Sequence, residues 1–407
     1  MTKTDFRFLE ALRCSLTNEK VQWSDDMLVD DWMALFQQAE KHHVLPLIFE
    51  AVYDCSAAQL VPPELMMQFR QRAVRQVTMQ TIRTRDFLRL NKALRGRELR
   101  PLAVKGIICR ELYPNPDYRV SGDEDVLIGW DAFEACHKAM LEEGMQLSQP
   151  DENWQDSYEV PYGKLNSPLY IELHKEMFSH TSEAYGDWNR YFEDAIKNGV
   201  DMNIYGTPVL TMEPTQHLFY LICHAFKHFM HSGFGIRQVC DIVLFAQHYG
   251  KEIRWDYMMT HCREINAEYF AAALFRMGTN YLGVTVALPN EWVALNVDEL
   301  PLLEDLLAGG IYGGSSMGRQ HSSNVTLNAV SANKTGKKAA PLMKSLFPTA
   351  KYLESRYPYL KKYPVLLPVA WVQRVVNYRK EMAAEDNNSL EIGNARVELM
   401  RKYRIIK

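Results

Sequence analysis

The segment 102-LAVKGIICRELYPNPDYRVSGDEDVLI-128 decides the fold of this chain. The apolar run before Lys105-Gly106 predicts a short strand, and a short helical stretch follows as far as Tyr113. Pro and Asn at 114–116 predict a turn, and the apolar run that begins at Asp125 predicts a second strand. Strand, helix, turn and strand in so short a stretch indicate the start of a mixed α/β core.

This mixed core extends towards the C-terminus. Residues 131–143 have a helical pattern, and Gly144 stands where a helix C-cap is expected. Two extended pieces, 158–160 and 169–173, flank a Gly- and Pro-containing turn and predict a hairpin. We therefore expect a small mixed-sheet core over residues 99–205.

Helical regions flank this core on both sides. Apolar residues recur at helical spacing through 1–98, where Pro62-Pro63 opens a long helix, and again through 206–308. Residues 309–340 are rich in Gly, Ser and Asn and predict a flexible loop. Residues 341–407 have a helical pattern and are basic, with 13 Lys and Arg against 6 Asp and Glu. The expected fold class is α+β.

Composition excludes several classes of protein. The chain has 407 residues, of which 47% are hydrophobic and 24% charged, so it is neither collagen-like nor wholly disordered. A formal net charge of −4 gives no strong nucleic-acid signal. The seven cysteines are scattered without a CxxC pair, which is typical of reduced, buried thiols. The first residues have no apolar stretch of the signal-peptide type, and the longest apolar run, 365–372, is far shorter than the roughly 20 residues of a membrane span. We expect a cytoplasmic protein without a transmembrane segment.

Three acidic residues form a candidate metal site. Asp123 and Asp125 stand two apart at the head of a strand, so their side chains share one face, about 7 Å apart along the strand. In the later strand, Glu172 and His174 share the polar face. If the two strands are neighbours, Glu172 can add a third oxygen ligand for a divalent cation. The alternative is a solvated strand end, because an Asp-x-Asp pair arises readily by chance.

The quoted residues resemble a known family. Leu102 to Gly106, Tyr113, Arg119, Asp123-Glu-Asp125 and Ile171 to His174 resemble the signature of a bacterial group of uncharacterised nucleotidyltransferases of the DNA polymerase β-like superfamily. The resemblance is clearest over 100–176 and weaker at 224–241 and in the N-terminal region. It implies a nucleotidyltransferase-like core, an NTP substrate such as ATP, and Mg²⁺ held by Asp123, Asp125 and Glu172.

The chain departs from the superfamily pattern at three points. The turn ends in Lys105-Gly106 where Gly-Ser is commoner, and the gap from Gly106 to Asp123 is longer than usual. Glu124 stands where a hydrophobic residue is typical, but its side chain is expected to face away from the metal side. The first two departures affect how a triphosphate is held.

The implied reaction transfers a nucleoside monophosphate to a hydroxyl of an unidentified acceptor and releases pyrophosphate. The metal offsets charge at the α-phosphorus. Backbone N–H groups after Gly106 would suit an anion, and Lys105 and Arg119 would neutralise phosphates. The alternatives are a surface position for Lys105 and a structural ion pair of Arg119 with Asp123 or Glu124.

Histidines in the second half give a competing signal. Four of them fall within an arc of roughly 60° on one helix: His217, His224, His228 and His231. They could bind a transition metal, and His228 with Asp241 would then suggest a metallohydrolase. The alternative is a polar stripe that lines a cleft against the core. The resemblance implies roles near the nucleotide for His174, His224 and His228.

Two further hypotheses remain open from the sequence. The basic C-terminal region could contact a phosphate-rich partner or an anionic membrane surface, or it could pack as helices with solvated basic edges. The whole chain could also be a non-catalytic nucleotide- or partner-binding module on the same fold.

Overall fold

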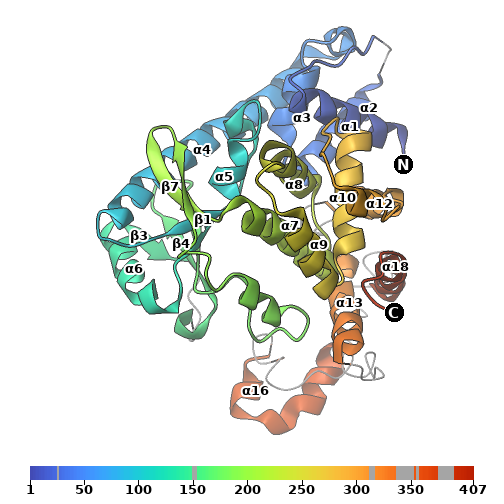
Figure 1. Ribbon diagram of the computed structural model, residues 1–407. Helices are drawn as coiled ribbons and strands as arrows, with labels where there is room; N and C mark the ends of the chain where they lie inside the picture. The colour runs from blue at the N-terminus through green and yellow to red at the C-terminus, as the bar shows by residue number, and fades with distance from the viewer. Residues whose placement is uncertain (25–26, 149–153, 311–316, 336–352, 354–356, 375–388) are drawn as a thin grey trace.

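A mixed seven-stranded sheet lies at the centre of the protein (Figure 1). The computed structural model describes residues 1–24, 27–148, 154–310, 317–335, 353, 357–374 and 389–407. The strands, in the order β3-β4-β5-β2-β1-β7-β6, are β1 Leu102–Val104, β2 Glu124–Leu127, β3 Met145–Leu147, β4 Glu159–Lys164, β5 Tyr170–His174, β6 Val200–Ile204 and β7 Thr207–Thr211.

The register of the central strands places the acidic residues together. β2 pairs antiparallel with β1 and parallel with β5, and Asp125 stands opposite Glu172 in that ladder. Residues opposite one another in a sheet point to the same face. The two strands that carry the acids are therefore neighbours, as the candidate metal site required. The predicted hairpin is also confirmed, as β4 paired with β5.

The expected α+β class is confirmed, although the sheet is wider than the sequence predicted. The additional hairpin, β6-β7, turns at Tyr205 and Gly206, whose φ angles of 47° and 78° suit a tight hairpin turn. β6 is an edge strand of sequence Val-Asp-Met-Asn-Ile with mostly exposed side chains, so hydrophobic patterning alone could not reveal it.

The N-terminal helices pack on one another, and the last and longest of them also packs against the sheet. They are α1 Lys3–Leu16, α2 Val29–Lys41, α3 Leu45–Val52, the short 3₁₀ helix η1 Ser56–Leu60 and α4 Pro63–Arg95. As predicted, α4 begins at the Pro62-Pro63 pair, since proline is well suited to a first helical turn. Its buried Phe87, Leu90 and Leu94 face the interior.

Short helices connect the strands. They are α5 Gly106–Arg110, η2 Pro116–Tyr118, α6 Trp130–Glu142, η3 Trp154–Asp156 and η4 Gly186–Tyr191. The predicted helix over 131–143 corresponds to α6. Gly144 has a φ of 81°, the left-handed conformation of a helix-terminating glycine, which confirms the predicted cap.

The second half of the chain is helical. Its elements are α7 Pro214–His231, α8 Ile236–Tyr249, α9 Trp255–Glu264, α10 Glu268–Tyr281, α11 Asn290–Val293, α12 Leu300–Gly309, α13 Met317–Thr335, α16 Tyr359–Lys362, η6 Pro364–Leu366 and α18 Ser389–Lys402. One connected hydrophobic core extends from Phe8 in α1 to Ile406 near the C-terminus.

The loop predicted over 309–340 is wrong where α13 forms. The most buried side chains of α13 are small hydroxyls: Ser322 and Thr326 are fully buried, and Thr326 Oγ1 donates to the carbonyl of Met230 at 2.5 Å. The sequence prediction looked for a stripe of apolar side chains, whereas this helix buries hydroxyl side chains that bond to a neighbouring helix. The rest of the predicted loop, 311–316 and 336–340, lies outside the described residues.

Part of the basic C-terminal region packs as a helix against the rest of the protein, which was one of the two alternatives for this region. α18 lies beside α13 (Figure 1), and Arg396 is buried and donates to the carbonyl of His231 at 2.7 Å. No helix in the described ranges is long and apolar enough to cross a membrane. Much of 341–407 lies outside the described residues, so contact with a membrane surface or phosphate-rich partner stays a prediction.

Candidate active site

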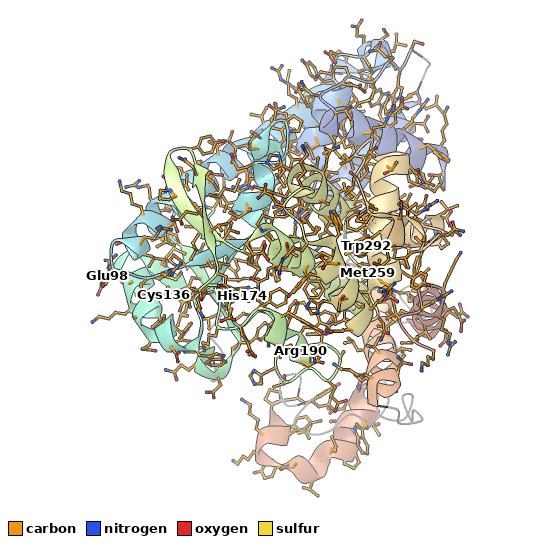
Figure 2. All side chains as sticks on the ribbon, in the orientation of Figure 1. Glu98, Cys136, His174, Arg190, Met259 and Trp292 are labelled. Atoms are coloured by element: carbon orange, nitrogen blue, oxygen red, sulfur yellow. The ribbon has the colours of Figure 1, made fainter. Side chains whose placement is uncertain are left out.

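Asp125, Glu172 and His174 converge on the sheet face that looks towards α7. Each offers a ligand atom, and these atoms lie within 4.8 Å of one another. His174 Nε2 is 3.1 Å from Asp125 Oδ1 and 4.0 Å from Glu172 Oε2. Asp125 and His174 are only 3% and 4% exposed. Figure 2 shows His174 near the centre of the molecule, where the sheet meets the helices of the second half.

The three predicted metal ligands are brought together only in part. Asp125 and Glu172 belong to the group, whereas Asp123 lies just before β2 and lines an adjacent cavity together with Asp125. His174, predicted as a nucleotide contact, completes the group instead. The alternation along β5, which puts Glu172 and His174 on one face, was the signal for this role.

Lys105 reaches into the same cluster. Its Nζ lies 2.8 Å from Asp125 Oδ2 and 2.9 Å from His224 Nε2, and its side chain is only 14% exposed. The surface position considered for Lys105 is therefore wrong. Both oxygens of Asp125 are engaged, one by the Lys105 ammonium and the other by the His174 imidazole.

The backbone of Lys105 is strained. Its φ of 53° and ψ of −119° lie in a region that residues with a Cβ seldom adopt. The N–H of Lys105 donates to His217 Nε2 at 3.2 Å, and its carbonyl accepts from Ile108 and Cys109 at 2.9 and 2.8 Å. These bonds fix the turn that aims the lysine at Asp125.

The electrostatics of the cluster separate its two carboxylates. Burial opposes ionisation of Asp125, but Lys105 and His174 nevertheless hold its pKa below the ordinary value. Burial, reinforced by the charges of Asp125 and Asp123, raises the pKa of Glu172 to about 7. One carboxylate is thus kept charged, and the other titrates near neutrality.

The helix start after Gly106 is already occupied by a protein carboxylate. Glu124 Oε2 accepts the N–H of Ile107 at 2.8 Å, and Glu124 also pairs with the buried Arg110. A Cβ at Gly106 would overlap the Glu124 carboxylate, which explains the glycine. The side chain of Glu124 faces away from Asp125, as predicted. The predicted anion site on the N–H groups after Gly106 is wrong at Ile107, because Glu124 takes that donor.

Arg119 forms a buried ion pair, but with a carboxylate that the sequence analysis did not propose. Its Nε and Nη2 lie 3.1 and 2.5 Å from the two oxygens of Asp241 on α8, and Tyr113 Oη donates to the same carboxylate at 2.7 Å. Burial opposes ionisation of Asp241, yet Arg119 keeps its pKa low. Neither Asp123 nor Glu124 is the partner. Within the described ranges, Nη1 of Arg119 is buried without a hydrogen-bond partner.

A small cavity lies beside this cluster. Its walls come from the Lys105 turn, the head of β2, α7 and α8, and include Lys105, Gly106, Arg119, Asp123, Asp125, His224, Arg237, Gln238 and Asp241. The free volume of about 20 Å³ is room for water, not for a nucleotide. Arg237 and Gln238 were missed by sequence reasoning, although each lies one helical turn before Asp241 on α8, at the i, i+4 and i, i+3 spacings that bring side chains together.

The histidines of α7 form a hydrogen-bonded stripe against the core. His217 holds the Lys105 backbone, His224 Nε2 lies 3.1 Å from His228 Nε2, and His231 Nε2 lies 3.0 Å from Tyr185 Oη. Burial lowers the pKa of His217 to about 3 and that of His231 to about 4. Within the described part of the chain, none of the four joins the group that could hold a metal. The hydrogen bonds agree with the polar-stripe alternative, and His224 lines the cavity beside the cluster.

The protonation of His224 follows from its neighbours. Its Nε2 faces the Lys105 ammonium, which only donates, so Nε2 must accept and Nδ1 must carry the proton. Nδ1 lies 3.2 Å from the side-chain amide of Gln238, whose Oε1 has no partner among the described residues. Exchanging the two amide atoms lets the amide oxygen accept from Nδ1–H of His224. Burial, followed by the charge of Lys105, lowers the pKa of His224 well below its ordinary value.

Comparisons with known proteins place the chain among nucleotidyltransferase-like sequences. A family described as uncharacterised nucleotidyltransferase matches residues 29–283, a range that contains every residue of the site. A solved structure, an antigenic nucleotidyltransferase-like protein from Paracoccidioides brasiliensis, is similar over 51% of this chain and 93% of its own, with 11% identity and a TM-score of 0.31. No curated protein matches.

Proposed function

Because this chain belongs to the uncharacterised nucleotidyltransferase family, we propose that it transfers a nucleoside monophosphate from an NTP to a hydroxyl of an acceptor and releases pyrophosphate. The observation that carries the proposal is the convergence of Asp125, Glu172 and His174 beside a cavity that buried cationic side chains line. The carboxylates would bind a cation, and the neighbouring Lys and Arg side chains would contact phosphate. This combination suits a metal–nucleotide complex.

The donor set fits a divalent cation. Two carboxylates and an imidazole suit Mg²⁺ or Mn²⁺, and we propose Mg²⁺ with Asp123 as a further oxygen donor at its edge. His174 Nδ1 is buried without a hydrogen-bond partner among the described residues, and Glu159 Oε2 is 3.7 Å away. A small movement would let Glu159 accept from Nδ1–H and leave Nε2 to bind the metal. Bound Mg²⁺ would offset charge at the α-phosphorus and acidify the attacking hydroxyl.

The remaining polar residues would hold the nucleotide. Arg119 is anchored by Asp241 and keeps Nη1 for a phosphate oxygen, while Arg237 and Lys105 line the same cavity. Because the cavity has room only for water, phosphate groups must widen it, and the Lys105 side chain is the flexible part of its wall.

The test is transfer of label from each α-³²P-labelled NTP with Mg²⁺, with and without cell extract as the source of acceptor. We expect an acid-stable labelled product with the wild type. A double Asp123→Asn/Asp125→Asn variant should lose at least about 100-fold in rate, as removal of comparable electrostatic groups does. Asp131→Asn, an exposed acid on α6, is the matched control.

Full activity in the double variant would contradict the proposed site. NTP binding without any turnover in the wild type would instead favour the non-catalytic binding module.

A further inference from the structure

The Lys105 ammonium engages the same carboxylate that a cation would need. Nζ lies 2.8 Å from Asp125 Oδ2, while the other oxygen of Asp125 faces His174 and the metal-ligand group. An ammonium on one oxygen of a carboxylate weakens the attraction of the other oxygen for a second positive charge. It also repels a divalent ion held by His174 and Glu172, because Asp125 and His174 are almost fully buried and screening between such groups is weak.

The fold holds this lysine in place. The strained turn at Lys105 is fixed by His217 from α7 and by Glu124, which accepts from the N–H of Ile107, so the side chain leaves the backbone aimed at Asp125. His224 is neutral and accepts from the same ammonium, which adds a second anchor. The ammonium is therefore a built part of the cluster.

The cavity beside Lys105 offers the ammonium another partner once an anion enters. Lys105 lines this cavity together with Arg119 and Arg237, so a phosphate group there would meet several positive charges. The side chain of lysine can swing between two anions because its charge sits on a flexible four-carbon stem.

We propose that Lys105 couples cation binding to nucleotide binding, an inference that rests on the proposed function. Its ammonium competes with the divalent cation for Asp125 until a phosphate-bearing nucleotide draws the ammonium into the cavity. The cation alone then binds weakly, and cation and nucleotide each strengthen the binding of the other.

The first experiment measures binding of Mn²⁺ alone to the full chain by electron paramagnetic resonance. We expect Lys105→Gly and Lys105→Met to bind Mn²⁺ at least about tenfold more tightly than the wild type, and Lys105→Arg, which keeps the charge, to resemble it. Lys105→Gly also suits the backbone, because glycine adopts positive φ readily, and Lys105→Met provides a second neutral side chain.

The second experiment measures coupling by calorimetry with the α,β-methylene analogue of each NTP, without metal and with saturating Mn²⁺. For each protein we divide the affinity for the analogue with saturating Mn²⁺ by its affinity without metal. This ratio should be larger for the wild type than for Lys105→Gly. Chelation of Mn²⁺ by the free analogue is the same for both proteins and does not affect the comparison. Equal Mn²⁺ affinity in the wild type and both neutral variants would overturn the role of Lys105 and leave the metal site standing. No Mn²⁺ binding by any variant would overturn the metal site itself, and the coupling with it.

Discussion

Replacing Glu172 with Gln should stabilise the protein at alkaline pH while it damages the candidate site. Burial and the neighbouring Asp125 and Asp123 charges raise the pKa of Glu172 from 4.5 to about 7. In the folded protein, Glu172 therefore stays protonated up to about pH 7, whereas in the unfolded chain it ionises near pH 4.5. The folded state binds the extra proton between these values, so this residue favours folding at pH 5 and loses that contribution as the pH rises through 7.

The magnitude follows from the pKa. Each unit of pKa is worth about 1.4 kcal/mol, so complete titration would cost the folded state about 3.4 kcal/mol. The Glu172 side chain is 30% exposed, and solvent screens part of this energy. We therefore expect the wild type to lose about 1–2 kcal/mol of unfolding free energy relative to Glu172→Gln between pH 5 and pH 8.

The assay is urea unfolding at pH 5 and pH 8 in EDTA. The wild-type and Glu172→Gln midpoints should lie close together at pH 5, and the variant should be the more stable protein at pH 8. Glu183→Gln, an exposed acid, is the control and should follow the wild type at both pH values. Parallel pH dependence of the wild type and Glu172→Gln would refute the reasoning. A residue that destabilises the folded protein near neutrality is typical of a functional site.

Three further changes test the surrounding structure. Gly106→Ala should destabilise the protein by several kcal/mol in urea unfolding, because its Cβ would overlap the Glu124 carboxylate; an unchanged midpoint would contradict the close approach. Glu159→Gln should weaken Mn²⁺ binding about 10–100-fold in titrations, since it removes the carboxylate that we propose accepts from His174 Nδ1–H when the metal is bound; unaltered affinity would remove Glu159 from the site. Arg119→Met should cost about 3–5 kcal/mol in thermal or urea unfolding, because the Asp241 carboxylate on α8 would stay buried without its hydrogen-bonded ion-pair partner; a loss of nucleotide binding without loss of stability would assign Arg119 to the ligand alone.

Local pattern was sufficient to predict the central strands and their acids. Asp125 and Glu172 could be assigned from alternation, because the face of a residue in a strand depends only on its position in the chain. Gly144 and the Pro62-Pro63 pair marked helix ends through their own backbone preferences. These predictions rest on short-range stereochemistry and needed no knowledge of distant contacts.

The predictions that failed concern partners far apart in the chain. Arg119 pairs with Asp241, 122 residues away, and no local pattern encodes that distance. The helix α13 has a weak apolar stripe of its own and packs against α7 and α18, where Thr326 bonds to the carbonyl of Met230.

The sequence by itself determined the fold class, the two acid-bearing strands and the face on which their carboxylates lie, because strand periodicity and turn residues act locally. Only the tertiary structure decided which groups share the site. It brought the ammonium of Lys105 onto Asp125, His174 into the ligand group, and Glu124 under the turn at Gly106. The pairing of the charged groups depends on the register of β2 against β5 and on the packing of α7. Both are set by contacts between segments that are far apart in the sequence.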